Sequence, residues 1–149
     1  MTTDPTTTDP RTVRVDEFLA HPPARVWKAL TDPDMLAEWL MPNDFAAVVG
    51  HRFTFHTVPR PNSGFDGVVR CEVLAVEPER LLRYSWRGGS LDTTVTWTLA
   101  AEGRGTRLFV EHDGFDPDDP LQQRTRTILG NGWRSNIMSA LRKALTTES

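Results

Sequence analysis

The sequence contains a single cysteine, Cys71, in 149 residues. One thiol cannot close an internal disulfide or build a cysteine cluster for a metal, so the fold must depend on an apolar core. Apolar residues nowhere run together for the roughly eighteen positions that a membrane-spanning helix needs, and no membrane insertion is expected. The first residues also lack the basic start and apolar stretch of a signal peptide, so we expect a cytoplasmic protein.

An excess of charge of one sign is also missing. The chain has 17 basic and 20 acidic residues, which gives a formal net charge of −3. No strongly basic surface follows from this balance, so nucleic acid is not an expected partner. Hydrophobic residues make up 38% and charged residues 25%, which is the composition of a globular domain, and the length favours one domain.

The motifs of common catalytic and cofactor sites are absent from the sequence. It has no GxSxG element, no glycine-rich phosphate loop, and no HxH or HExxH spacing. The residues therefore predict no metal and no cofactor, and they give no support to nucleophilic catalysis. Cys71 shares a strand face with Val69 and Val73, a position that predicts a buried and unreactive thiol.

Aromatic residues are abundant, with five Trp and seven Phe beside one Tyr. They lie in a domain predicted over residues 13–147, after a tail of Thr, Asp and Pro at 1–12 that we expect to be disordered. Apolar alternation predicts a first strand at 13–20, with a bulge where the pattern switches at Phe18. Two short helices follow, starting near Pro23 and Asp32. Six more strands are predicted at 45–49, 51–58, 67–77, 80–87, 91–99 and 106–113.

The last segment predicts a long amphipathic helix over about 120–146. Its apolar stripe recurs every four residues, at Leu121, Thr125, Leu129, Trp133, Ile137, Leu141 and Leu145. Gly130 and Gly132 interrupt the pattern, so the helix either bends there or begins at Asn131.

These elements predict an α+β fold in which a seven-stranded antiparallel sheet curves around one helix. A single helix covers such a sheet incompletely, so we expect a cavity between the two, where ligands commonly bind. The strand and helix phases predict that aromatic residues and a histidine line it. They are Phe53, Phe55, Tyr84, Trp86, Trp97, His112 and Trp133.

Four segments, in order along residues 13–145, resemble the START-like (SRPBCC) superfamily, in particular its branch related to the activator of the Hsp90 ATPase (AHSA1-like). The segments are VWKALTDP at 26–33 with WL at 39–40; GVVRCEV, EPERL and YSW between 67 and 86; TVTWTL and GTRL between 94 and 108; and GW at 132–133. The resemblance implies the helix-grip fold. It also implies a range of functions, because the superfamily includes lipid carriers, aromatic polyketide cyclases, self-sacrificing resistance proteins and chaperone activators.

Our leading hypothesis is therefore binding of a small, largely apolar, aromatic or lipid-like molecule, without assigned chemistry. The alternatives are an enzyme of the polyketide cyclase type that uses the same cavity, and a chaperone co-activator that acts on a protein partner. An exposed edge strand would also allow a homodimer. We expect ligand contacts from Trp39, Phe45, Phe53, Phe55, Tyr84, Trp86, Trp97, His112, Phe115, Leu129 and Trp133.

His112 and Tyr84 are the polar residues that the strand pattern points inward, where they would orient a ligand's polar end. The alternatives are a core histidine satisfied by neighbouring groups and a tyrosine whose hydroxyl is wet at the rim. We expect Arg70 to form a surface ion pair; a bulge in its strand would instead turn it inward. Phe65 and Phe115 lie on polar loops, which suggests lids over the cavity, or rings folded back onto the domain.

Overall fold

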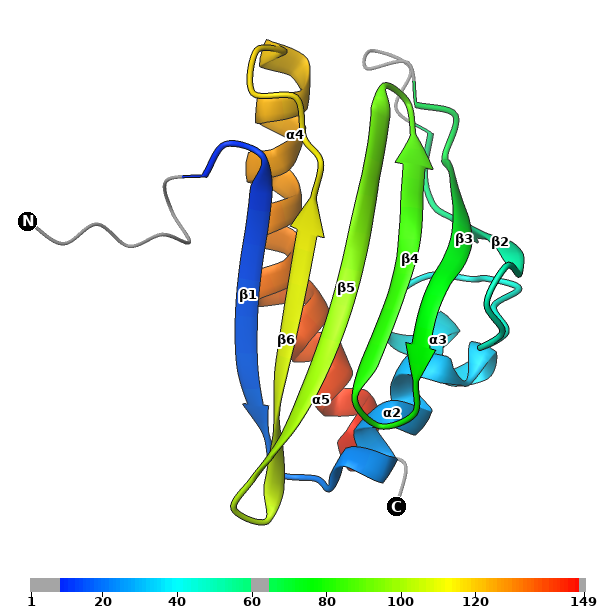
Figure 1. The fold of residues 1–149 in the computed structure, drawn as a ribbon, viewed down its shortest axis with the longest axis vertical. Helices are drawn as coiled ribbons and strands as arrows, with labels where there is room; N and C mark the ends of the chain where they lie inside the picture. The colour runs from blue at the N-terminus through cyan, green and yellow to red at the C-terminus, as the bar shows by residue number, and fades with distance from the viewer. Residues whose placement is uncertain (1–8, 60–64, 148–149) are drawn as a thin grey trace, which may run out of the picture.

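One six-stranded antiparallel sheet, in the order β1-β6-β5-β4-β3-β2, packs against a long C-terminal helix in the computed structural model (Figure 1). The structure describes residues 9–59 and 65–147. The strands are β1 (Thr12–Leu19), β2 (Arg52–His56), β3 (Val68–Glu77), β4 (Leu81–Gly88), β5 (Leu91–Glu102) and β6 (Gly105–Asp113). The expected α+β helix-grip architecture is confirmed. Residues 1–8 of the predicted tail lie outside the described residues, and Thr12 is the first residue of β1.

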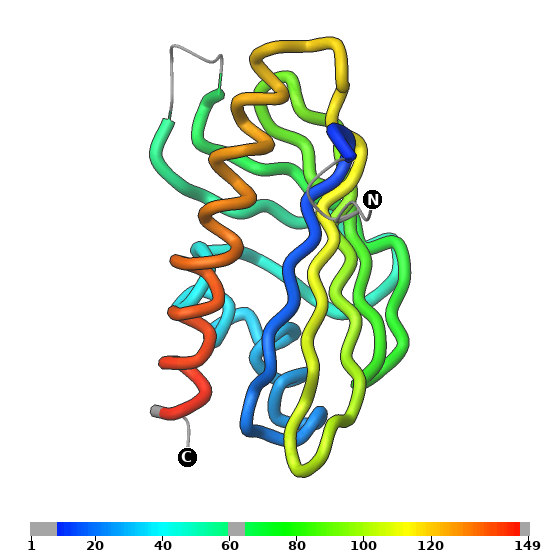
Figure 2. The backbone as a smooth tube through the Cα atoms, turned by 90° about the vertical axis from the view of Figure 1, so that its left-hand side faces the viewer, coloured from blue at the N-terminus to red at the C-terminus, as the bar shows by residue number. Residues whose placement is uncertain are grey.

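Helices occupy the two places that the sequence predicts. The helical elements are α2 (Pro23–Thr31), α3 (Pro33–Trp39), α4 (Pro120–Asn131), the π-helical η2 (Gly132–Ile137) and α5 (Met138–Thr147). A proline begins α2, α3 and α4, where its missing N–H costs nothing. The carboxylates of Asp32 and Asp119 cap α3 and α4 by accepting backbone N–H groups. The last three elements form one continuous helix (Figure 2), so the long helix begins at Pro120 and not at Asn131.

The predicted seventh strand at 45–49 is wrong. Phe45 is buried, but Val48 and Val49 are 63% and 61% exposed. Hydrogen bonds within this segment make turns, because the Val48 N–H donates to Ala46 and the His51 N–H donates to Val48. The segment that comes before it, around Asn43 and Asp44, instead bonds to β2, where the Asp44 carboxylate accepts from the Thr54 N–H. One buried aromatic residue thus anchors an irregular connection.

The bulge predicted in the first strand is also wrong. β1 pairs with β6 in unbroken register from Thr12 to Leu19, so Phe18 points outward and Leu19 inward. The irregularity lies in β3, where the register with β4 shifts between Val73 and Ala75.

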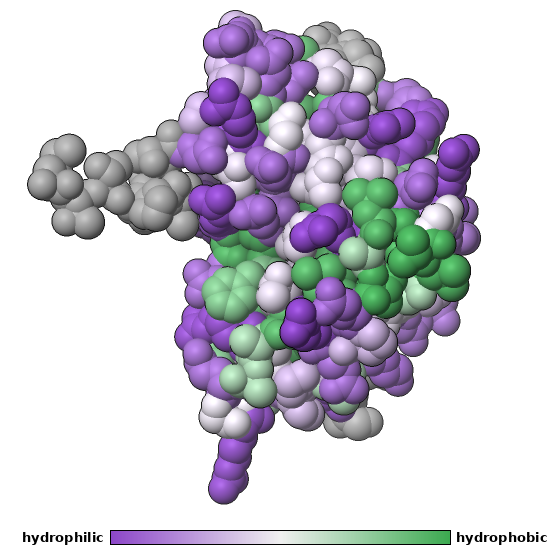
Figure 3. Space-filling model, in the orientation of Figure 1, coloured by the Kyte–Doolittle hydropathy of each residue, from purple (hydrophilic) through white to green (hydrophobic). Residues whose placement is uncertain are grey.

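Figure 3 views the outer face of the sheet, where polar side chains surround a patch of apolar ones. Leu74, at the β3 irregularity, is 43% exposed. Val48 and Val49 lie beside it, because the N–H of Gly50 donates to the carbonyl of Val73.

No helix within the described residues is long and apolar enough to cross a membrane.

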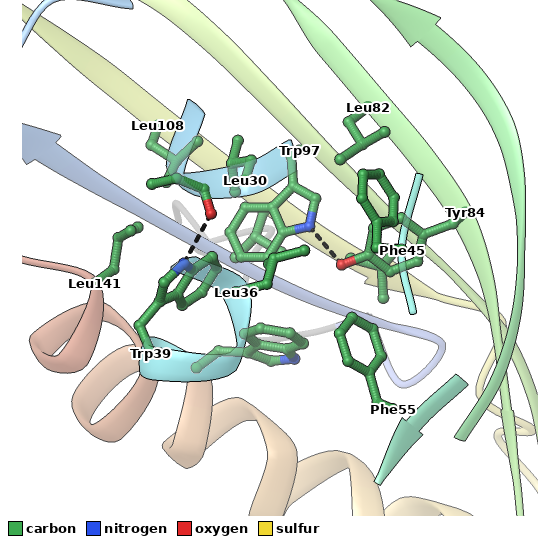
Figure 4. Close-up of a cluster of buried hydrophobic side chains, with 14 of the residues drawn as sticks. Leu30, Leu36, Trp39, Phe45, Phe55, Leu82, Tyr84, Trp97, Leu108 and Leu141 are labelled. Atoms are coloured by element: carbon green, nitrogen blue, oxygen red, sulfur yellow. Dashed lines mark hydrogen bonds between the residues drawn. The ribbon is translucent and has the colours of Figure 1, made fainter. Parts of the chain in front are cut away.

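The inner face of the sheet forms the core. Phe55, Tyr84 and Trp97 point inward from β2, β4 and β5 and are almost fully buried (Figure 4). Helices α2 and α3 pack against α5 at the same end of the molecule, whereas α4 lies against β1. The core is therefore filled where α2, α3 and α5 meet the sheet, and space remains beside α4.

Candidate functional site

Two neighbouring hollows lie between the long helix and the sheet. The larger has a volume of about 710 Å³ and the smaller about 380 Å³. Both are lined by Met41, Trp86, Ile128 and Leu129, so the two adjoin and share a wall. A volume of this size suits an organic molecule of moderate size.

The lining of both hollows is mainly apolar. The larger is completed by Thr57, Pro59, Phe65, Val69, Gly88, Gly89, Ser90, Leu91, Leu121, Arg124 and Thr125. The smaller is completed by Leu40, Asn131, Gly132, Trp133, Ser135, Asn136 and Ile137. Helix α4 and the π-helical segment η2 therefore form one side, and the ends of β3, β4 and β5 form the other.

Two tryptophans form the aromatic wall of this site. The rings of Trp86, on β4, and Trp133, on η2, lie with centroids 5.8 Å apart and planes inclined at 62°. Trp133 is 2% and Trp86 is 5% exposed, so each offers only a small part of its surface to the hollows. Gly132 precedes Trp133, and a Cβ atom placed on this glycine would meet nothing within 4 Å. The helix thus leaves open space beside an aromatic ring.

A buried chain of hydrogen bonds connects the two tryptophans through His112. The indole N–H of Trp133 donates to Nδ1 of His112 at 3.3 Å. Nε2 of His112 lies 2.7 Å from Oγ1 of Thr93, and that hydroxyl donates to the carbonyl of Trp86 at 2.8 Å. Since the only proton of the Thr93 hydroxyl is used, Nε2 must carry the proton that bridges to it. The donor and the acceptor of each hydrogen bond in this series are therefore defined.

His112 is neutral in this environment. Burial lowers its pKa from 6.5 to about 3, because desolvation disfavours the charged ring. Both ring nitrogens are bonded to neighbours, and the side chain lines neither hollow. The arrangement corresponds to a satisfied core histidine and leaves it no nitrogen for a ligand.

The other two polar residues singled out from the sequence are also engaged elsewhere. The Tyr84 hydroxyl accepts a hydrogen bond from the Trp97 indole at 2.9 Å, and burial raises its pKa (Figure 4). The irregularity in β3 lies beyond Arg70, between Val73 and Ala75, so it does not turn Arg70 inward. Arg70 points outward and pairs with Asp66 at 3.1 Å, with both side chains more than half exposed. Neither Tyr84 nor Arg70 lines a hollow.

Of the eleven residues expected to contact a ligand, three line the hollows: Trp86, Leu129 and Trp133. The remaining eight are buried in the core: Trp39, Phe45, Phe53, Phe55, Tyr84, Trp97, His112 and Phe115. Sequence reasoning did not select Met41, Ile128 or Arg124 for the site. Helical spacing could have indicated Ile128, which widens the stripe and is 61% exposed.

The two loop phenylalanines differ in position. Phe115 is 1% exposed, with its ring 4.8 Å from the ring of His112, so it belongs to the core and forms no lid. Phe65 lines the larger hollow and packs beside Gly88. Residues 60–64 of the loop that carries Phe65 lie outside the described residues.

Cys71 is buried, and desolvation raises the pKa of its thiol. Among residues 9–59 and 65–147, no cluster of three or more His, Cys, Asp or Glu side chains is arranged to hold a metal ion.

The family model "Activator of Hsp90 ATPase homolog 1-like protein" (AHSA1) matches residues 20–146. The chain belongs to this family. The match begins directly after β1 and runs from α2 almost to the end of α5, so it includes both sides of the hollows. A search of curated protein sequences gave no match.

Several solved structures are similar in fold to this AHSA1-like chain. Protein MLL2253 from Mesorhizobium loti is 38% identical, with a TM-score of 0.81, over 93% of this chain and 99% of that one. CalU16 from Micromonospora echinospora is 25% identical, with a TM-score of 0.73, over 92% of this chain and 77% of that one. DynU16, described as a protein in the dynemicin biosynthetic locus, is 26% identical with a TM-score of 0.75. The alignment with DynU16 covers 92% of this chain but 48% of DynU16.

Proposed function

We propose that this AHSA1-like protein binds a small, largely apolar molecule in the two adjoining hollows beside α4. The observation that carries the proposal is the shared wall of Trp86 and Leu129, which makes one apolar site of about 710 Å³ with a side chamber of about 380 Å³. Burial of apolar ligand surface there contributes about 25 cal/mol per Å² before the costs of ordering the ligand. Trp86 and Trp133 favour ligands with flat rings.

Binding without chemistry is favoured over acid–base catalysis by the lining itself. Among the described residues of both hollows there is no His, Cys, Asp, Glu, Lys or Tyr side chain. A general acid or base near neutral pH comes most often from these residue types. His112 and Tyr84 belong to the core and have their polar atoms engaged.

The likeness to DynU16, a protein of a biosynthetic locus, favours one alternative, an enzyme. The polyketide cyclases of the SRPBCC superfamily suggest an enzyme that folds a reactive chain in the same hollows. Such an enzyme would convert a linear polyketide substrate, and its product would be detected by mass spectrometry. The family name favours another, a chaperone co-activator. A co-activator would raise the ATPase rate of a chaperone with no small molecule present.

The binding proposal is tested with N-phenylnaphthylamine, a neutral aromatic probe that becomes fluorescent in apolar sites. We expect saturable binding by the wild-type protein. Leu129→Trp fills the shared wall and should weaken binding about tenfold or more. The same change at Leu74, on the outer face of the sheet, is the matched control and should leave the affinity unchanged. Absence of binding by the wild type, or equal affinity of the two variants, would refute the proposal.

A further inference from the structure

The larger hollow is chemically uneven. Among its described lining residues, Arg124 is the only one with a charge. Thr125 follows it on α4, while Ser90 in the β4–β5 turn and Thr57 after β2 add neutral polar groups. Val69, Trp86 and Leu91 form the apolar floor. The site therefore combines one cation with a mainly apolar surface.

Arg124 also differs from most arginines of this protein. Seven arginines of the described chain form ion pairs with carboxylates: Arg14, Arg52, Arg70, Arg80, Arg87, Arg107 and Arg142. Arg25, Arg83 and Arg126 hydrogen bond to carbonyl or hydroxyl oxygens. Arg124 has neither kind of partner within the described residues. Arg124 is exposed and lines the larger hollow, and none of its guanidinium donors is bonded to a described residue.

No carboxylate offsets this charge from within the site. Asp and Glu are absent from the described linings of both hollows. Two neutral residues just before it on α4, Gln122 and Gln123, direct their side-chain amides to the carbonyls of Ser90 and Pro10. An anionic group in the larger hollow would therefore meet an uncompensated positive charge.

We infer that the ligand is an amphipathic anion, with a ring-bearing apolar body and an oxyanion group such as a carboxylate or sulfonate. The body packs on Trp86 and Trp133, and the oxyanion accepts hydrogen bonds from Arg124. A guanidinium presents paired N–H donors that match the two oxygens of such a group. The inference rests on the proposed function of the hollows and adds the charge of what they bind.

Two probes with the same ring skeleton test the charge. Anilinonaphthalene sulfonate carries a sulfonate, and N-phenylnaphthylamine does not. We expect Arg124→Gln to weaken binding of the anionic probe by about five- to tenfold and to leave the neutral probe unchanged. Arg134→Gln is the matched control, because Arg134 is exposed on the same helix but lines neither hollow. Added salt should weaken binding of the anionic probe to the wild type and should have less effect on its binding to Arg124→Gln.

The two proposals fail in different ways. If the wild type does not bind the neutral probe, or if Leu129→Trp leaves its affinity unchanged, the binding site itself is refuted. If the neutral probe binds in the hollows but Arg124→Gln and Arg134→Gln affect the sulfonate equally, the binding site stands and the preference for an anion is overturned.

Discussion

Trp133 donates its indole N–H to Nδ1 of His112 across 3.3 Å of the buried interface between η2 and β6. A wall of the candidate binding site is thus held by a core residue that does not itself line the site. Thr93 continues the connection to the backbone of Trp86, the other aromatic wall. The two rings that form the wall are linked through the core behind them.

Replacement of His112 by Ala should destabilise the protein by about 2–4 kcal/mol. The change leaves a cavity at a fully buried position and removes the partners of Trp133 and Thr93. Urea unfolding at neutral pH measures the free energy of unfolding. His56→Ala is the control, because His56 is exposed, and it should cost less than about 0.5 kcal/mol. Similar values for the two variants would contradict the role assigned to His112.

The buried histidine should make the folded protein less stable in acid. Its pKa is lowered from 6.5 to about 3, so the unfolded chain takes up this proton first as the pH falls. The free energy of unfolding should decrease from about pH 6.5 toward pH 3, by up to about 1.4 kcal/mol per pH unit, and this group has no effect above that range. His112→Gln should show a shallower decrease. Proton NMR gives a second measure, since a ring of His112 that titrates near pH 6.5 would contradict the prediction.

Cys71 should not react in the native state. Its thiol is buried and its pKa is raised by desolvation, so almost no thiolate forms at neutral pH. Ellman's reagent should therefore modify the folded protein far more slowly than the protein in urea. Rapid modification under native conditions would show that β3 opens locally.

Two glycines should respond to alanine in opposite directions. Gly132 has ordinary helical dihedral angles, φ −61° and ψ −47°, and open space at the Cβ position. Gly132→Ala should stabilise the protein by about 0.5–1 kcal/mol. A Cβ on Gly105 would lie 2.4 Å from the carbonyl oxygen of Leu19, so Gly105→Ala should cost about 1–3 kcal/mol. Thermal unfolding distinguishes the two, and a destabilising Gly132→Ala would show that the π segment needs glycine.

The sequence was sufficient to predict which residues of each strand point to the core. Alternation along a strand decides which residues point to the core, so Phe53, Tyr84 and Trp97 were correctly placed inward. The sequence could not distinguish inward residues that are packed in the core from those that line a cavity. This distinction depends on where the helices lie on the sheet. Helices α2, α3 and α5 cover the end that holds Trp97, whereas α4 leaves Trp86 at the edge of a hollow.

The spacing of the apolar residues in the last helix is explained by the π-helical segment. An apolar stripe with a strict four-residue spacing, from Leu121 to Leu145, drifts by about 40° at each step of a regular α-helix. Yet every member of the stripe is at least partly buried. A π-helix has more residues per turn than an α-helix, so the π-helical segment Gly132–Ile137 reverses part of this angular drift. Gly130 and Gly132 marked the region but not the kind of irregularity.

A π-helical turn is equivalent to one residue inserted into an α-helix. Here it separates α4 from α5, and these two parts of the long helix make different contacts. On its C-terminal side α5 packs on α2 and α3, while on its N-terminal side α4 borders the hollows. Deletion of one residue from η2 would rotate α4 by about 100° relative to α5. Such a change would present new side chains to the ligand while the stable end kept its packing. The long helix therefore offers descendants of this protein a way to change binding specificity by a shift in length, without replacing the core.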